Sequence, residues 1–255
     1  ICIGKSTKVV QYLSERNKKY RTSIKFGITT ETQDKYGKII EQVSVPDIDV
    51  MTVNGLIGGF KGKILQTPPM YSAIKYKGKK LYQYALEGET VEVKSRPIEI
   101  FDISLVDKTD RDEFILDVSC SKGTYIRTLC NDIGEKSGYG AHMAQLIRLK
   151  SSPFCIEDSV TLEDIQLAAN TFQNLLCAPD FLFSDLNKIT IKKSAEKSAI
   201  NGNPIFSAGV EDDIDIYKAG SMIRLYIEGK FIALGIIAHD DTNDRNFIKI
   251  KTLFT

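Results

Sequence analysis

The sequence predicts an α+β fold: a mostly antiparallel mixed sheet with packed helices, followed by a small β-rich unit. Three observations support this prediction. Over 114–120, apolar residues at 114, 116, 118 and 120 alternate with Ile115, Asp117 and Ser119, which is the period of a half-buried strand. Apolar residues at 126, 129, 130 and 133 then follow the spacing of one helical face. Beyond Asp185, short apolar stretches alternate with turns such as 201–204 and 228–229.

The other elements are indicated in chain order. Residues 20–26 alternate as a strand that ends at Gly27, and residues 29–37 form a polar loop with turn residues at Asp34 and Gly37. The remaining predicted elements are strand character over 38–45, a short helix over 50–60, strands over 98–106 and 113–120 around a polar turn, a strand over 143–149, and a helix over 162–176. A change of texture near Lys188 predicts two domains, 1–187 and 188–255.

Composition limits the function classes. The chain is 42% hydrophobic, with 34 basic and 33 acidic residues, so a nucleic-acid site would have to be a local patch. The five cysteines are odd in number and lack C-x-x-C spacing, so we expect reduced thiols and a cytoplasmic protein. Two histidines far apart in sequence argue against a His-based zinc site. No apolar run approaches the ~20 residues that a membrane span needs.

The most informative stretch is Ser-Lys-Gly-Thr-Tyr-Ile-Arg at 121–127. It places Tyr125 and Arg127 where a predicted strand gives way to a predicted helix. Side chains at such a junction can reach a ligand from a rigid base. From these residues alone, a glycine turn with a packed tyrosine and a solvated arginine is an equal alternative.

A second candidate segment lies between Met70 and Pro97. Four lysines are interleaved with tyrosines there: Lys75, Lys77, Lys79 and Lys80 with Tyr71, Tyr76, Tyr82 and Tyr84. Cations for phosphates and rings that stack on bases are typical of nucleic-acid binding, and stacking contributes ~1–3 kcal/mol per base. The alternative is a solvated lysine-rich loop flanked by core tyrosines.

A nucleoside triphosphatase is a competing hypothesis. Residues 1–7 resemble the end of a phosphate-binding loop, with an apolar strand, Gly4-Lys5-Ser6 and a helix, and Asp117 after an apolar run would hold magnesium. The rest of the chain lacks the strand–helix alternation of a doubly wound sheet, which weakens this hypothesis.

Taken together, the motifs resemble the bacterial tRNA pseudouridine-55 synthases, the TruB family. The resemblance runs in order over nearly the whole chain, through 1–8, Lys-Lys-Tyr-Arg at 18–21, the 27–37 loop, 69–82, 96–97, 120–127 and 140–149. The tail from about Lys188 resembles a PUA domain, a small RNA-binding β-barrel, though less sharply.

The resemblance implies isomerisation of one uridine in the T-arm of tRNA, with no cofactor and no metal. The base must leave its stack before the glycosidic bond is accessible. Tyr20 matches the ring that stacks on the flipped base, Tyr125 a second pocket ring, and Leu146 an apolar pocket contact. Arg127 matches the cation paired with a nucleophilic Asp. The lysine-rich segment, with Lys75, Tyr76, Lys77, Lys79 and Lys80, matches the loop that clamps the T-arm. Asp34 matches a loop residue that we expect to be structural or to face the RNA.

One family motif is not found. The family's nucleophile lies in Gly-x-Leu-Asp-Pro-x-Ala-Thr-Gly, just before the stretch that matches Ile1, and residues 1–255 do not contain it. We therefore expect further residues upstream, an active parent enzyme, and an inactive chain 1–255. A non-catalytic tRNA-binding fragment is the alternative. We expect a monomer whose partner is tRNA, with no membrane association.

Overall fold

The structure, a computed structural model, describes residues 1–255, apart from the side chains of residues 169 and 170. The chain divides into two compact units: residues 15–159, and residues 1–14 together with 160–255. The predicted boundary between residues 187 and 188 falls inside the second unit, and a domain division there stays a prediction. Among the described residues, no helix has the length and apolar composition needed to cross a bilayer.

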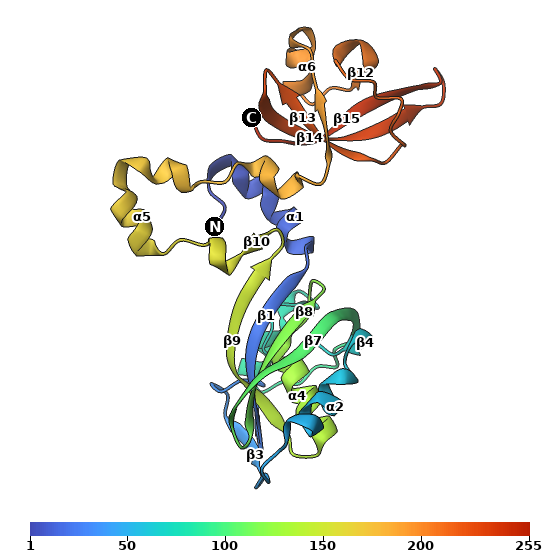
Figure 1. Cartoon of the computed structure of the whole chain (residues 1–255). Coiled ribbons are helices and arrows are strands. Elements are labelled where there is room, and N and C mark those ends of the chain that lie inside the picture. Colours follow the sequence, from blue (N-terminus) through green and yellow to red (C-terminus); the bar gives the residue numbers. More distant parts are fainter. The chain divides into compact units, whose positions relative to one another are not determined.

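The unit of residues 15–159 is built on a six-stranded sheet in which every neighbouring pair is antiparallel. Figure 1 shows its long strands side by side. In sheet order the strands are β10 (Phe154–Cys155), β9 (Ala141–Ser151), β1 (Lys18–Phe26), β8 (Glu113–Cys120), β7 (Arg96–Asp110) and β4 (Gly62–Gln66). The predicted strands at 20–26, 98–106, 113–120 and 143–149 are all confirmed, and β7 and β8 form the predicted hairpin.

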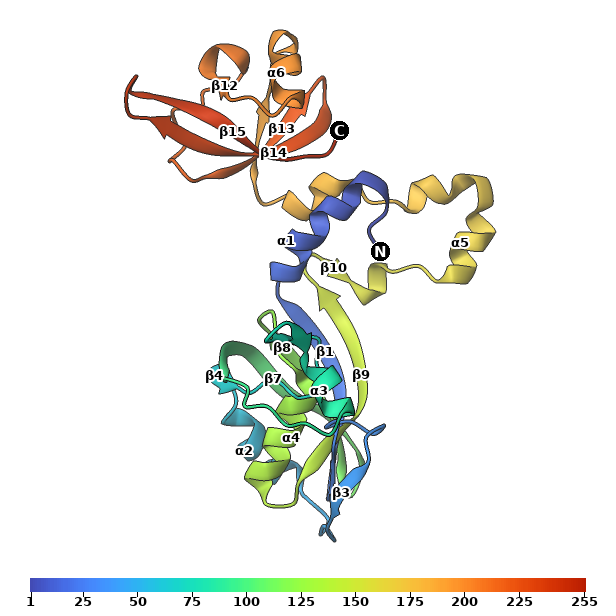
Figure 2. The ribbon, with the colours of Figure 1, turned by 180° about the vertical axis from the view of Figure 1, so that it is seen from behind.

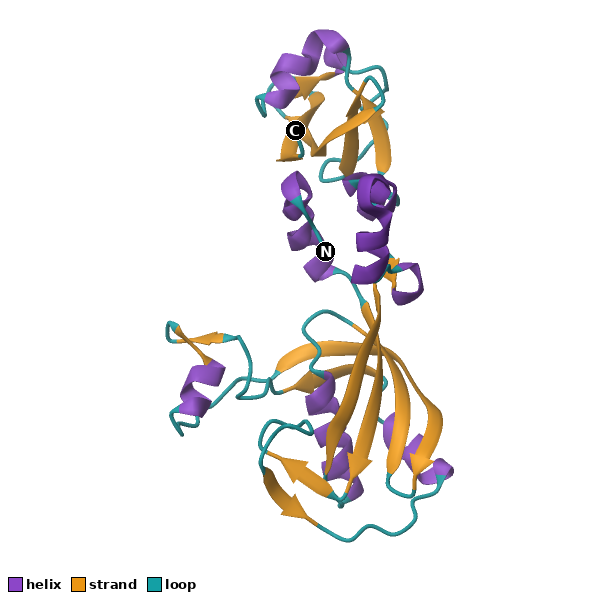
Figure 3. Cartoon of the chain, turned by 90° about the vertical axis from the view of Figure 1, so that its left-hand side faces the viewer, coloured by secondary structure: helices purple, strands orange, loops and turns teal.

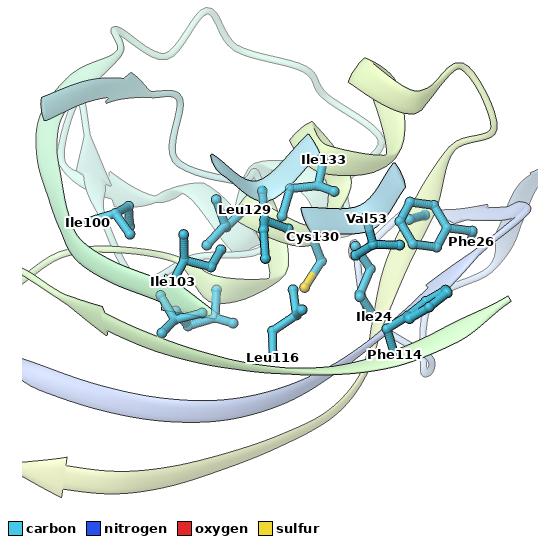
Figure 4. Close-up of a cluster of buried hydrophobic side chains, with 14 of the residues drawn as sticks. Ile24, Phe26, Val53, Ile100, Ile103, Phe114, Leu116, Leu129, Cys130 and Ile133 are labelled. Atoms are coloured by element: carbon cyan, nitrogen blue, oxygen red, sulfur yellow. The ribbon is translucent and has the colours of Figure 1, made fainter. Parts of the chain in front are cut away.

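Two helices cover one face of this sheet, α2 (Val50–Gly58) and α4 (Ile126–Ser137). The apolar spacing that predicted α4 is confirmed, because Ile126, Leu129, Cys130 and Ile133 are all buried. Gly138 ends the helix with φ +80°, a left-handed conformation that glycine adopts without steric cost. Figure 4 shows the α4 side chains meeting apolar side chains of β1, β7 and β8 in one core.

Smaller elements are appended to this unit. A two-stranded sheet of β2 (Ile28–Thr30) and β3 (Ile39–Gln42) flanks the predicted polar loop. A short hairpin of β5 (Lys75–Tyr76) and β6 (Lys79–Lys80) leads into α3 (Leu81–Leu86), which is labelled in Figure 2. Figure 3 shows this hairpin and its helix joined by loops to the body of the unit. The unit ends with the 3₁₀ turn η2 (Ile156–Asp158).

The other unit contains a second sheet, of five strands. Its order is β11 (Asn187–Thr190), β13 (Met222–Ile227), β14 (Lys230–Asp240), β15 (Arg245–Leu253) and β12 (Ile205–Phe206), with β11 and β13 parallel and the other pairs antiparallel. Its helical segments are η1 (Gly4–Val9), α1 (Val10–Glu15), α5 (Leu162–Ala168), η3 (Ala169–Leu175), η4 (Pro179–Phe183), η5 (Lys193–Ala195), α6 (Glu196–Ile200) and η6 (Ser207–Gly209). The predicted β-rich character beyond Asp185 is confirmed.

Two local expectations differ from the structure. Residues 1–3 form no strand, and the side chains of Ile1 and Ile3 are exposed. The predicted helix over 162–176 is α-helical only as far as Ala168, where α5 passes into η3. The predicted start of this helix at residue 162 is confirmed, and the hydroxyl of Thr161, just before it, accepts from the Asp164 amide (3.1 Å).

Candidate functional site

The junction between β8 and α4 has the rigid geometry that the sequence predicted. After β8 ends at Cys120, Gly123 turns the chain with φ +77°, and the Thr124 hydroxyl closes the turn on the Ser121 carbonyl (3.0 Å). The Ser121 hydroxyl in turn accepts a hydrogen bond from the Glu99 amide of β7 (2.9 Å). The turn is therefore fixed to the sheet before the helix begins.

Tyr125 is held by a residue that the sequence analysis missed. Its amide donates to Oε1 of Gln66 (2.8 Å), and its carbonyl accepts from Nε2 of the same side chain (3.0 Å). Gln66 ends β4 and is only 2% exposed, so this amide is buried and satisfied by one partner. Gln66 therefore clamps the backbone of Tyr125 and does not engage its phenol ring, and Tyr125 as a whole is half-buried.

Arg127 lies on the first turn of α4 and forms an ion pair with Asp34 (Nη1–Oδ2 3.4 Å). Its Nη2 donates to the carbonyl of Tyr71. The guanidinium carbon lies 6.0 Å from the centre of the Tyr125 ring, at the outer limit of a cation–π contact. Both charged side chains are mostly buried, at 21% and 16% exposure, so solvent screens this pair less than a surface pair.

Asp34 belongs to the loop between β2 and β3. Its Oδ1 accepts from the Thr32 hydroxyl (2.7 Å) and from the Tyr36 amide (3.1 Å), while Oδ2 faces Arg127. The role predicted for Asp34 is structural or RNA-facing, and a contact with Arg127 is not among the predictions. No local signal could have indicated this contact, because 93 residues separate the two positions.

Leu146 shares a pocket with Asp34. Residues 34–36 of the loop and 143–147 of β9 line this cavity of about 360 Å³. The Leu146 side chain is 44% exposed, so an apolar surface is available there. The structure thus brings Arg127, Tyr125, Asp34 and Leu146 into one neighbourhood.

Tyr20 lies on the face of β1 that also carries the buried side chains of Thr22 and Ile24. Its Cα partners are Val118 on β8 and Arg148 on β9. Burial raises the pKa of its phenol, and the nearby Arg148 guanidinium partly opposes this rise. Within the described residues, no hydrogen bond or ring contact joins Tyr20 to Tyr125 or Arg127, so a cleft shared by both tyrosines stays a prediction.

The lysine-rich segment forms the β5–β6 hairpin, whose two-residue turn is Lys77-Gly78 with φ +47° and +87°. The rings of Tyr76 and Tyr84 pack edge to face, with centroids 6.0 Å apart. Lys75, Lys77 and Lys80 are exposed, whereas Lys79 forms an ion pair with Glu87. The hairpin therefore presents exposed cations beside packed rings.

The triphosphatase hypothesis finds no support in this geometry. Asp117, its proposed magnesium ligand, pairs with Arg21 (Nε–Oδ1 2.8 Å) and Lys19 (3.2 Å), and Arg21 is the main cause of its lowered pKa. The segment before Gly4 is not a strand. In the part of the chain that the structure describes, no three His, Cys, Asp or Glu side chains are grouped to hold a metal.

Comparison with known proteins matches two family descriptions. Residues 1–126 match the "TruB family pseudouridylate synthase (N terminal domain)", and residues 127–182 match the "tRNA pseudouridylate synthase B C-terminal domain".

Two similar curated proteins are both named tRNA pseudouridine synthase B. The protein from Alkaliphilus oremlandii (strain OhILAs) is 40% identical over 99% of this chain and 83% of its own length. The protein from Clostridium tetani (strain Massachusetts / E88) is 40% identical over 92% of this chain and 79% of its own length.

Solved structures share the fold at lower identity. An H/ACA RNP bound to a substrate RNA containing 2'-deoxyuridine has a chain with TM-score 0.68 and 20% identity, covering 99% of this chain and 70% of its own. A Cbf5-Nop10-Gar1 complex has a chain with TM-score 0.68 and 22% identity, and the match covers 99% of this chain and 71% of that one. These likenesses confirm the predicted fold class over nearly the full chain.

Proposed function

This chain belongs to the TruB family of pseudouridylate synthases, and from that premise we propose that its substrate is a uridine in the T-arm of tRNA, at position 55. The product is pseudouridine at the same place. Two relatives 40% identical to this chain carry the name tRNA pseudouridine synthase B, and the neighbour with bound RNA has the same fold. The observation that carries the site assignment is the Arg127–Asp34 ion pair at the start of α4.

The reaction is an isomerisation, so nothing is added to the uridine. The bond between N1 of the base and C1′ of the ribose breaks, a bond between C5 and C1′ forms, and one proton leaves C5 while one is gained at N1. A carboxylate nucleophile divides this change into two easier steps through a covalent intermediate. What the protein must supply is a flipped base, a held carboxylate and a pocket that excludes water.

Arg127 is suited to hold that carboxylate. A guanidinium has five N–H donors, and Asp34 and the Tyr71 carbonyl each take one. The other three N–H donors have no partner among the described residues. All donors of a guanidinium lie in one plane, and this geometry allows two parallel hydrogen bonds to a second carboxylate. Because Asp34 fixes one edge of the guanidinium, the other edge is oriented before the substrate arrives.

The aromatic and apolar side chains would receive the base. Tyr125 stands 6.0 Å from the Arg127 guanidinium, and Leu146 offers an apolar wall in the pocket that includes Asp34. Tyr20 stacks on the flipped base in this proposal. Stacking of ~1–3 kcal/mol per ring offsets the few kcal/mol needed to take a base out of its stack.

Two surfaces would hold the rest of the RNA. The exposed lysines of the β5–β6 hairpin lie beside Tyr76, which suits contacts to phosphates and bases of the T-arm. The sheet from β11 to β15 is the region that resembles a PUA domain, and we assign it a second, auxiliary RNA contact.

The test is to incubate the natural full-length protein with an unmodified tRNA transcript and to map pseudouridine by mass spectrometry of nuclease fragments. We expect one pseudouridine in the T-loop fragment, and none in a transcript with cytidine at position 55. Pseudouridine elsewhere would refute the position, and its complete absence would refute the activity. The same assay on residues 1–255, with a binding measurement, tests the expectation that they bind tRNA without converting it.

A further inference from the structure

The loop that carries Asp34 contains a residue in an unfavourable backbone conformation. Gln33 has φ +64°, one of four positive φ values among the non-glycine residues that the structure describes. A left-handed conformation is unfavourable for a residue with a Cβ atom. Such residues persist where the surroundings hold them in place, and Gln33 immediately precedes the carboxylate that faces Arg127.

The side chain of Gln33 is held by α4. The hydroxyl of Thr128 donates to Oε1 of Gln33 at 2.7 Å, and Thr128 is only 3% exposed. A threonine inside a helix usually turns its hydroxyl back to a carbonyl of the preceding turn. Here the hydroxyl reaches out of the helix to the loop, so the Thr128–Gln33 hydrogen bond joins two separate elements.

The backbone of the loop is fixed as well. The Met143 amide donates to the Gln33 carbonyl (3.0 Å), and the Lys35 amide donates to the Met143 carbonyl (3.0 Å). Asp34 therefore sits between two residues tied to the start of β9. These backbone hydrogen bonds fix the loop to β9, while the side-chain hydrogen bond from Thr128 fixes it to α4.

Two adjacent links thus connect the loop to the helix. Residues 33 and 34 on the loop face residues 128 and 127 on α4, one pair joined by a neutral hydrogen bond and the other by the ion pair. The neutral pair takes no part in the chemistry proposed for Arg127. It ties the side chain of Gln33, whose backbone is in the left-handed region, to the helix that carries Arg127.

We propose that the Thr128–Gln33 hydrogen bond positions the Asp34 carboxylate on Arg127, which makes Gln33 and Thr128 positioning residues for pseudouridine formation. This inference rests on the function proposed above for Arg127. It also accounts for the residue type at position 33. Glycine would remove the strain but has no side chain to accept from Thr128, and asparagine is one methylene shorter.

The test uses the natural full-length protein and three variants. Thr128→Val keeps the shape and loses the donor, Thr128→Ser keeps the donor, and Gln33→Gly loses the acceptor while relieving the backbone. We expect the single-turnover rate to fall about 10- to 100-fold in Thr128→Val and Gln33→Gly, because small misplacements of catalytic groups have effects of this size. The Kd for tRNA should stay within about twofold, and Thr128→Ser should retain most of the rate.

A second measurement separates positioning from a general effect on folding. Amide hydrogen exchange of residues 30–37 should become faster in Thr128→Val and stay near wild type in Thr128→Ser. Gln33→Gly is decisive if Thr128→Val folds poorly, because relief of strain offsets the lost hydrogen bond, so its melting temperature should stay near wild type while its rate falls.

The outcomes distinguish this inference from the proposed function. If wild type is active and both Thr128→Val and Gln33→Gly keep its rate, the positioning role is overturned and the proposed function stands. If wild type forms no pseudouridine at all, the proposed function falls and takes the positioning role with it. A slow Gln33→Gly variant with normal tRNA affinity and normal melting supports the inference.

Discussion

Asp34 contributes a fixed negative charge to one edge of the Arg127 guanidinium. Both of its oxygens are occupied, one by Thr32 and the Tyr36 amide and the other by Arg127. A carboxylate held in this way has little freedom to serve as a nucleophile. Its effect is instead to orient the arginine, so its removal should disturb the reaction more than the binding of RNA.

We therefore predict that Asp34→Asn lowers the single-turnover rate about 10- to 100-fold and changes the Kd for tRNA by less than about twofold. The amide keeps the shape of the side chain and loses the charge. The matched control is Asp102→Asn, which removes an exposed ion pair with Lys61 on the same unit. Equal rate losses in the two variants would contradict the orienting role of Asp34.

Asp132 on α4 gives a prediction about stability and pH. Burial, with a smaller contribution from Glu135, raises the pKa of this carboxyl from 3.8 to about 6. Between these values the folded protein keeps a proton that the unfolded chain has lost, so the free energy of unfolding decreases as pH rises through this window. Above about pH 7 the Asp132 carboxylate is charged in the folded protein, which then bears the full free-energy cost of this half-buried charge.

Asp132→Asn should therefore be more stable than wild type by about 1 kcal/mol at pH 7.5, after allowance for solvent screening of the half-exposed carboxylate. The difference should shrink toward zero as pH falls to 4. Urea unfolding at several pH values measures it. A difference that is independent of pH would show that some other effect of the amide is responsible.

At the scale of elements, α4 and the turn before it were predictable because their signals are local. The apolar spacing of 126–133, Gly138 and the strand before Ser121 all lie within a few residues of the structure that they specify. The Gln66 clamp on Tyr125 and the Asp34 contact with Arg127 were not predictable. Each depends on how strands and loops far apart in sequence meet, and local patterns in one sequence do not indicate such contacts.

The β5–β6 hairpin provides a prediction for RNA binding. Lys77→Ala combined with Lys80→Ala should weaken tRNA binding and reduce the slope of log K against log salt by about one for each lost phosphate contact. Lys79 is left unchanged, because its pairing with Glu87 makes it a poorer phosphate ligand. Fluorescence anisotropy over a range of salt concentrations gives the slope.

The control for charge alone is Lys63→Ala combined with Lys136→Ala, two exposed lysines on β4 and α4 of the same unit. This pair also removes two positive charges. If both double variants change the slope equally, the hairpin has no special role in holding the RNA.

At the scale of the whole molecule, the compact units do not follow chain order. Residues 1–14 fold with 160–255, where the Tyr12 ring packs edge to face on Phe183 (centroids 5.1 Å apart) and its hydroxyl lies 2.6 Å from the Thr252 hydroxyl. The sequence showed the change of texture near Lys188 but not this return of the N-terminal segment. The fold class could be predicted from periodicity, whereas contacts across about 240 residues could not.

This arrangement predicts that Tyr12→Ala destabilises the unit that contains β11–β15. We expect a loss of about 1–3 kcal/mol in the free energy of local unfolding, since a half-buried ring is removed, and about 1 kcal/mol for Tyr12→Phe, which loses only the hydrogen bond. Native-state hydrogen exchange of β13 and β14 measures both. Tyr36→Ala is the control, because the Tyr36 side chain is 86% exposed. Equal protection in Tyr12→Ala and wild type would contradict this role of residues 1–14.

The most direct test of the role of Arg127 is the yield and rate of pseudouridine formation in a single turnover, with the natural full-length protein or its Arg127→Ala variant in excess over unmodified tRNA and all of the tRNA bound. We expect close to one pseudouridine per bound tRNA for wild type. The rate of the variant should be lower by at least about 1,000-fold, with a similar Kd, because the lost interaction acts on the reacting groups. A variant that converts tRNA at the wild-type rate, or that loses binding and rate in equal measure, would contradict the central claim that Arg127 serves the chemistry.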